Sequence, residues 1–299
     1  MDLSVATTGL PADNRGGDTL HWPIWRSIRV VSDINPGLMM STGFRCKQFY
    51  VDHGDCAMKV GTDALLLGAW TALPASGSIL DIGCGSGILA LMLAQRTAAD
   101  PAIAVDAIEL DPAAAAAAAQ NFRQSSWDQR IRLIKGDILT YPGSADHPSG
   151  RRYALIVSNP PFFVAALKSA NEQRRQARHT DSLSFAGLLQ SAALLLADQG
   201  RFSLVLPCAE AELLLAEALG TGWVLVADCL VQTTAHKPPS RRLMTLARPA
   251  VARPAVQLTA TPAPPVTRLL IHQTSAALPG AGAYSPAYRA LLRDFYLKF

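Results

Sequence analysis

Hydrophobic and polar positions along the chain follow two alternating periods. Short runs of apolar residues indicate buried strands at residues 79–82, 104–110, 131–135, 153–158 and 201–206. Apolar residues at helical spacing predict helices at residues 86–96, 183–197 and 210–219, and Asp111 with Pro112 is typical of a helix start. Strands that alternate with helices predict an α/β fold with a doubly wound, mainly parallel sheet. Residues 224–231 and 242–247 are expected to form a terminal antiparallel pair of strands, which brings the sheet to seven strands.

Composition narrows the class of protein. The chain is 49% hydrophobic and 17% charged, which excludes disorder as a whole and suffices for one large core. No uninterrupted run of about 18 apolar residues is present, so we expect no membrane span. No secretory signal follows Asp2, and the five scattered cysteines lack C-x-x-C spacing; we therefore expect a cytoplasmic protein with reduced thiols and no metal site. A net charge of +4 permits a nucleic-acid partner.

The first strand runs into a glycine-rich turn. Residues 81–87 read D-I-G-C-G-S-G, and glycines at such a turn let the backbone approach a ligand closely. A dinucleotide fingerprint would place its third glycine at position 88, which is Ile88 here. The observed spacing instead resembles motif I of the class I methyltransferases. That resemblance implies S-adenosyl-L-methionine as cofactor, held by Asp81, Gly83, Gly85 and Gly87.

Two further acidic residues follow the next two strands. Glu109 ends the second strand, where a carboxylate can accept hydrogen bonds from both ribose hydroxyls of a nucleoside. Asp137 follows the third strand and is placed to meet the cofactor's adenine ring. For Asp137 alone, an incidental acidic residue in an ordinary α/β turn remains an alternative. We expect the Asp81 carboxylate near the cofactor's methionine end.

The fourth strand leads directly into Asn159-Pro160-Pro161-Phe162. This is the carboxyl edge of the sheet, where open α/β folds bind ligands, and the prolines stiffen the turn. The exocyclic amine of adenine is a poor nucleophile, and two fixed acceptors could orient it. We expect the Asn159 side-chain oxygen and the Pro160 carbonyl to hold its N–H groups, and Phe162 to stack on the base. This chemistry needs neither a metal nor a strong general base.

Several blocks outside these motifs resemble one family. They are F-R-C-K-Q-F at 44–49, C-A-M-K-V-G-T-D at 56–63, L-L-G-A-W at 66–70, Q-A-R-H-T at 176–180 and R-D-F-Y-L at 293–297. With N-P-P-F they resemble the bacterial valine-tRNA adenine-N6 methyltransferases. The resemblance implies methylation of adenine 37 in the anticodon stem-loop of a valine tRNA. It also implies that Lys59, Thr62 and Asp63 lie over the cofactor pocket. Many relatives carry tyrosine where this chain has Phe162.

The pattern and the resemblance together suggest four segments. Residues 79–248 form the methyltransferase core, and residues 41–78 form a cap segment over the cofactor pocket. Residues 249–299 combine a Pro/Ala-rich surface segment with an aromatic tail that packs back onto the core. Residues 1–40 have no sustained period. They are either a disordered tail or the product of an over-extended start site, since Met39 and Met40 offer later starts.

Two basic stretches could contact RNA phosphates. Arg174, Arg175, Arg178 and His179 follow the catalytic turn, and Lys237, Arg241 and Arg242 lie between the last two predicted strands. For both stretches a solvated charged loop is the alternative. The acceptor also stays open: guanine-N2 of ribosomal RNA or glutamine-N5 of a release factor would suit the same turn. A nicotinamide oxidoreductase and a non-catalytic RNA-binding module are rivals from other classes.

Overall fold

The computed structural model describes residues 43–56, 58–161, 183–248, 263–273 and 284–299. The chain divides into two units, Met1–Met40 and Ser41–Phe299, and the fold below is that of the second unit. The expectations for residues 1–40 lie outside the described residues.

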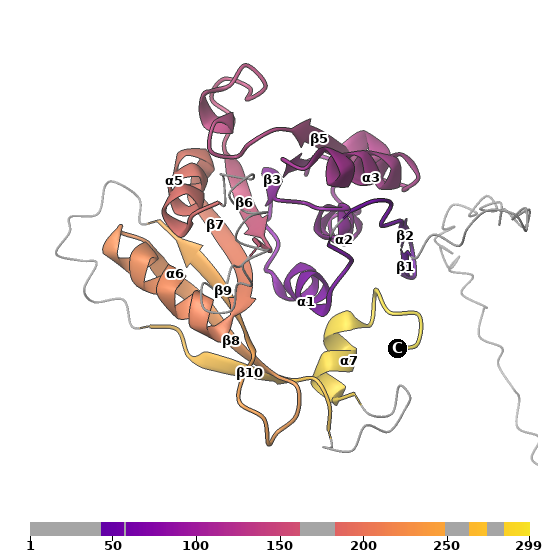
Figure 1. Cartoon of the computed structure of the whole chain (residues 1–299), viewed down its shortest axis with the longest axis vertical. Coiled ribbons are helices and arrows are strands. Elements are labelled where there is room, and N and C mark those ends of the chain that lie inside the picture. The colour runs from indigo at the N-terminus through magenta and orange to yellow at the C-terminus, as the bar shows by residue number, and fades with distance from the viewer. Residues whose placement is uncertain (1–42, 57, 162–182, 249–262, 274–283) are drawn as a thin grey trace, which may run out of the picture. The chain divides into compact units, whose positions relative to one another are not determined.

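An eight-stranded sheet forms the middle layer, in the order β10-β8-β9-β7-β6-β3-β4-β5 (Figure 1). The strands are β3 (Ser78–Ile82), β4 (Val105–Glu109), β5 (Ile131–Lys135), β6 (Tyr153–Ser158), β7 (Leu196–Pro207), β8 (Val224–Gln232), β9 (Arg241–Ala247) and β10 (Val266–Leu270). All neighbours pair in parallel except β9, which is antiparallel to both β7 and β8. The mainly parallel sheet and the antiparallel pairing are confirmed.

The strand count of seven was wrong by one. The additional strand, β10, pairs in parallel with β8 at the edge of the sheet. Its sequence gives a weak signal, because Leu269 is buried whereas Val266, Thr267 and Arg268 are exposed. An edge strand with one buried side chain has little of the apolar run that identifies an interior strand.

Helices cover both faces of the sheet. One face carries α1 (Thr62–Trp70), α2 (Ile88–Arg96), α3 (Pro112–Arg123) and α7 (Pro286–Leu292), which share one apolar cluster. The other face carries α5 (Phe185–Leu195) and α6 (Cys208–Gly220), which share a second cluster. Short elements complete the fold: a hairpin of β1 (Phe44–Arg45) and β2 (Tyr50–Val51), and the 3-10 turns η1 (Asp128–Arg130) and η2 (Tyr141–Gly143). Among the described residues no helix is both long and apolar enough to cross a bilayer.

The aromatic tail packs onto the core, as predicted. Tyr288, Leu292 and Phe295 are buried in the same cluster as α1 and α2. Lys47 fastens the hairpin to this tail, because its backbone N–H donates to the Phe295 carbonyl at 2.9 Å and its Nζ donates to the Arg293 carbonyl at 2.6 Å. Segments from the two ends of the described chain thus close one face of the sheet together.

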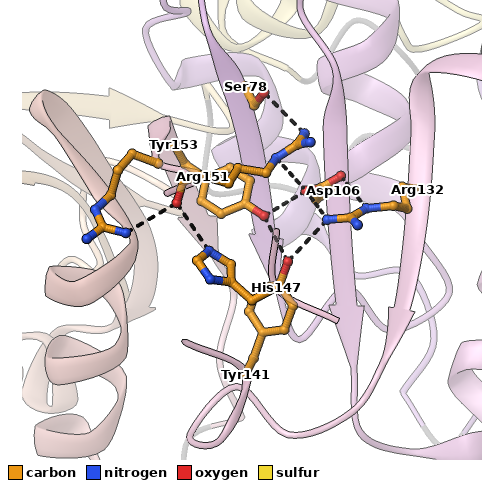
Figure 2. A network of polar contacts seen from close by, with 8 residues as sticks. Ser78, Asp106, Arg132, Tyr141, His147, Arg151 and Tyr153 are labelled. Atoms are coloured by element: carbon orange, nitrogen blue, oxygen red, sulfur yellow. Dashed lines mark hydrogen bonds and ion pairs between the residues drawn. The ribbon is translucent and has the colours of Figure 1, made fainter. Parts of the chain in front are cut away.

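A buried polar network holds the amino edge of the sheet (Figure 2). The Asp106 carboxylate accepts hydrogen bonds from Arg132 at 2.8 and 3.0 Å and from the Tyr153 hydroxyl at 2.6 Å, and it pairs with Arg151 at 3.1 Å. Asp106 itself is only 1% exposed. The Tyr141 hydroxyl joins the network through Tyr153 at 3.1 Å. Because these residues start β4, β5 and β6 or follow β5, the network stabilises the edge opposite the carboxyl ends.

Candidate active site

The predicted site residues meet because three parallel strands end in register. Ile82 of β3 pairs with Ile108 of β4 and with Ser158 of β6, so the residues that follow each strand emerge at one edge. The fully buried Ser158 hydroxyl donates to the Ile82 carbonyl at 2.9 Å. This bond ties the turn that begins at Asn159 to the glycine loop.

The three glycines of the loop all have positive φ angles. Gly83, Gly85 and Gly87 have φ of 68°, 56° and 89°, which residues with a Cβ rarely adopt. A Cβ at Gly83 or Gly85 would meet no atom within 4 Å, whereas a Cβ at Gly87 would lie 2.4 Å from the ring of Phe122. The first two glycines therefore leave room for a ligand, and the third allows helix α3 to pack closely.

Glu109 organises the loop from the neighbouring strand. Its Oε2 accepts a hydrogen bond from the Gly85 N–H at 2.7 Å, and its Oε1 accepts from the Asp111 N–H at 2.9 Å. A carboxylate can accept about four hydrogen bonds, so acceptor capacity remains for ligand hydroxyls. The Asp111 side chain in turn accepts from the Ala114 N–H at 2.7 Å and caps α3, as predicted.

Asp81 lies beneath the loop and is completely buried. Its Oδ2 accepts from the Ala90 N–H in the first turn of α2 at 3.1 Å, while its Oδ1 has no partner among the described residues. Burial raises the pKa of this carboxyl from 3.8 to about 8, with a smaller contribution from the charge of Glu109. An unpaired buried acceptor at this place suits a ligand that brings a hydrogen-bond donor or a positive charge.

Two cavities adjoin at Gly83. The first, of 350 Å³, is mainly apolar and is lined by Ile108, Glu109, Asp137, Leu139 and Pro161 among others. The Asp137 Oδ1 accepts from the Leu139 N–H at 2.9 Å, which fixes this carboxylate at the wall. The second cavity, of 50 Å³, is narrow and is lined by Lys59, Gly85 and Asn159 among others. A mainly apolar pocket next to a small one that contains Lys59 and the glycine loop fits a nucleoside that carries an amino-acid tail, as S-adenosyl-L-methionine does.

Asn159 lines the small cavity of the glycine loop. Pro160 is buried, and Pro161 lines the first cavity. Phe162 lies outside the described residues, as do the predicted RNA contacts Arg174, Arg175, Arg178 and His179.

The cap segment contributes residues to two neighbouring cavities. Lys59 lines the glycine-loop cavity together with Gly61 and Ala64, whereas Thr62 and Asp63 line a neighbouring third cavity. Helix α1 begins at Thr62, and successive side chains of a helix turn by about 100°, so one turn faces both cavities. The Asp63 carboxylate is paired with Arg241 Nε at 2.7 Å.

The other two basic residues near β9 differ in their surroundings. Lys237 is exposed in the loop between β8 and β9. Arg242 forms a two-fold hydrogen bond to the buried carboxylate of Asp228, at 2.6 and 2.9 Å. These hydrogen bonds raise the pKa of Arg242 above its ordinary value. The structure thus gives Arg242 a buried carboxylate as internal partner, which does not favour the predicted contact with an RNA phosphate.

Sequence reasoning missed two residues that fasten the cap segment. The buried Asn121 donates to the carbonyls of Asp52 and Ser86, both at 2.9 Å, and so joins the cap to the glycine loop. His53 accepts from the Val60 N–H at 3.1 Å. A polar asparagine that follows a run of alanines in α3 is a signal that could have identified Asn121.

Comparison with known proteins supports this geometry. Residues 56–225 match the model of the methyltransferase small domain family. The chain is 43% identical over 259 residues to a tRNA1(Val) (adenine(37)-N6)-methyltransferase of Photobacterium profundum, covering 87% of this chain and 100% of that protein. It is 42% identical to the protein of the same name from Tolumonas auensis, covering 85% and 97%. A solved structure from Agrobacterium tumefaciens, described as a predicted O-methyltransferase, shares the fold with a TM-score of 0.55 at 18% identity, covering 78% of this chain and 96% of that one.

Proposed function

The chain belongs to the tRNA1(Val) (adenine(37)-N6)-methyltransferase family, and we propose that it methylates N6 of adenine 37 in the anticodon loop of a valine tRNA. S-adenosyl-L-methionine is the cofactor of this reaction. The observation that carries the proposal is the meeting of Asn159 and the glycine loop in one cavity. We place the reaction in the cytoplasm, where tRNA is used in translation.

The residues around the two adjoining cavities would hold the cofactor. Gly83 and Gly85 leave space for it, and Glu109 keeps acceptor capacity for its ribose hydroxyls. Asp137 lies at the wall of the apolar cavity that suits adenine, and Asp81 offers an unpaired acceptor beneath the loop. Lys59 lines the same small cavity as this loop. Gly87, the last glycine of the loop, leaves room for the Phe122 ring of α3.

Asn159 and Pro160 would orient the acceptor. When bound, S-adenosyl-L-methionine supplies a methyl group made electrophilic by its sulfonium sulfur. The Asn159 side-chain oxygen and the Pro160 carbonyl each accept a hydrogen bond from one N–H group of the adenine amine. This favours a nitrogen whose lone pair points at the methyl group. Phe162, which follows the two prolines, would stack on the swung-out base.

The experiment that tests this function offers competing acceptors. The purified protein is incubated with methyl-labelled S-adenosyl-L-methionine and, separately, with tRNA, ribosomal RNA and a release factor. We expect label in N6-methyladenosine at position 37 of valine tRNA after nuclease digestion. Label in N2-methylguanosine or in N5-methylglutamine would assign a different acceptor to the same turn. The Asn159→Ala variant, treated identically, controls for contaminating methyltransferases.

A further inference from the structure

A third cavity lies beside the catalytic one and has no part in the mechanism above. It measures 350 Å³, and its chemistry comes from Asp63, Arg241, His272, Tyr284, Tyr288 and Tyr296. Cavities of this size lie in the lower range of small-ligand pockets. Its lining is polar and aromatic, which differs from the apolar cavity at Asp137.

The third cavity opens at the same edge of the sheet as the catalytic turn. Thr233 follows β8 and Ile271 follows β10, while Arg241 begins the antiparallel strand β9, so all three lie at the carboxyl edge. Helix α1 separates the two cavities by a single turn: Gly61 and Ala64 face Asn159, and Thr62 and Asp63 face the third cavity. A strand of RNA with one base at Asn159 would therefore have its next base within reach of the third cavity.

Aromatic rings form one wall of this cavity. The rings of His272 and Tyr284 are stacked with centroids 4.9 Å apart and planes inclined by 23°, and Tyr284 stacks on Tyr288 at 5.1 Å and 21°. Tyr288 is 2% exposed and its hydroxyl pairs with that of Tyr296 at 3.2 Å, which holds the column in place. Flat, fixed rings at a polar surface are the usual platform for unpaired bases of RNA.

A charged pair forms another part of the lining. Asp63 and Arg241 join at 2.7 Å, and their side chains remain 22% and 31% exposed. The carboxylate has lone pairs left to accept from an imino or amino N–H, and the guanidinium can donate to ring nitrogens or carbonyl oxygens. A base edge presents this mixture of donors and acceptors, whereas a phosphate would be repelled by the carboxylate.

We propose that the third cavity binds the base of a nucleotide adjacent to the target adenine. The ligand class is a nucleobase of single-stranded RNA, stacked on His272 at the open end of the His272–Tyr284–Tyr288 column and read at its edge by the Asp63–Arg241 pair. This inference rests on the proposed function, because it takes the occupant from the same RNA. It assigns to the C-terminal tail a part in substrate selection.

The test combines removal of one base from the RNA with removal of one aromatic ring from the cavity wall. Anticodon stem-loop hairpins carry an abasic ribose on the 5′ or the 3′ side of the target adenine. Their affinities for wild type, His272→Ala and Tyr284→Leu are measured by fluorescence anisotropy with S-adenosylhomocysteine present, and KM and kcat are measured in parallel. His147→Ala, at the opposite edge of the sheet, is the matched control. Circular dichroism and S-adenosylhomocysteine affinity verify that each variant is folded.

We expect one abasic position to weaken wild-type binding about tenfold, near the lower end for one stacked base. His272→Ala should weaken binding of the intact hairpin similarly and raise KM more than it lowers kcat, with little further loss on the abasic hairpin. The inference would be overturned if the affinity losses from the abasic position and from the variant multiplied when combined. It would also be overturned if the variants bound the intact hairpin as tightly as wild type does. In both cases methyl transfer to adenine would persist, whereas failure of the proposed function would appear as no transfer to adenine by wild type.

Discussion

The Glu109 carboxylate accepts the backbone N–H of Gly85 at 2.7 Å, so that one acidic side chain both shapes the glycine loop and faces the nucleoside cavity. In Glu109→Ala the N–H groups of Gly85 and Asp111 lose their acceptor, and the cofactor ribose loses one as well. We expect the affinity for S-adenosylhomocysteine to fall about 10- to 100-fold, as for a charge-assisted hydrogen bond. Titration calorimetry measures this loss. Glu109→Gln, which keeps one acceptor, should lose less; equal affinities for alanine and wild type would contradict the role.

Asn159 should matter for transfer and not for cofactor binding. In Asn159→Ala the adenine amine loses one of its two fixed acceptors, so kcat should fall at least 100-fold, in the range for one aimed hydrogen-bonding group. S-adenosylhomocysteine affinity should change less than about threefold. Single-turnover kinetics with labelled cofactor measures the first quantity and calorimetry the second. Asn159→Asp, which keeps an acceptor, should retain more activity than alanine, and wild-type turnover by alanine would refute the assignment.

The buried carboxyl of Asp81 should make stability depend on pH. Burial raises its pKa from 3.8 to about 8, so between these values the folded state holds a proton that the unfolded state releases. The free energy of unfolding from this group therefore decreases as pH rises through that window. The destabilisation of the folded state by the buried Asp81 charge is absent below pH 3.8 and complete above pH 8. Asp81→Asn removes the effect.

Urea unfolding of ligand-free protein at pH 5 and pH 8.5 checks this sign. The free energy of unfolding of Asp81→Asn minus that of wild type should be larger at pH 8.5 than at pH 5. At pH 8.5 wild type buries a charged carboxylate, whereas the variant does not. A difference between the two proteins that does not change with pH would show that the carboxyl titrates normally.

The Asp106 network should support stability without supporting catalysis. Asp106→Asn leaves Arg132 and Arg151 without the buried charge that they share. We expect a loss of about 2–4 kcal/mol in the free energy of unfolding, below the full range for buried pairs because Arg132 is 42% exposed. Below the melting transition kcat should be unchanged, since the network lies at the far edge. The exposed Asp128→Asn control should shift stability by less than about 0.5 kcal/mol.

Lys237 should contribute to RNA affinity through a phosphate. It is exposed in the loop that precedes β9, at the edge that carries the catalytic turn. The logarithm of the tRNA association constant should fall with the logarithm of salt concentration, and Lys237→Ala should reduce the slope by about 1. Arg152→Ala, at the opposite edge, should leave the slope unchanged. Identical slopes for Lys237→Ala and wild type would exclude a phosphate contact there.

Some elements could be predicted to the residue and others not at all. The bounds of β5 and β6 agree with the predicted 131–135 and 153–158, because turn-forming residues flank each apolar run. The sequence of helix α1 shows no helical alternation of polar and apolar residues. Six consecutive residues from Ala64 to Ala69 are buried, so this part of the helix is apolar all round. Burial on every side removes the polar face that identifies a helix.

The candidate site divides in the same way. The glycine loop and the Asn159 turn are contiguous in sequence, so local spacing revealed them. The pairing of Asp63 with Arg241 joins residues 178 positions apart, and nothing local in either sequence indicates the other. The same holds for Asp106 and Tyr153, which meet across strands 47 positions apart. Only the fold of the sheet brings such partners together.

The bonds from Lys47 to the tail have a consequence for biosynthesis. The acceptor carbonyl of Arg293 is separated from Lys47 by 246 positions, so a ribosome needs on the order of tens of seconds to produce it after the hairpin. For nearly all of that interval the nascent chain lacks Tyr284 and Tyr288, and Tyr296 follows only after Arg293, so the aromatic wall of the third cavity is absent. A polypeptide still under synthesis thus has its glycine loop long before it can bind the base next to the target adenine.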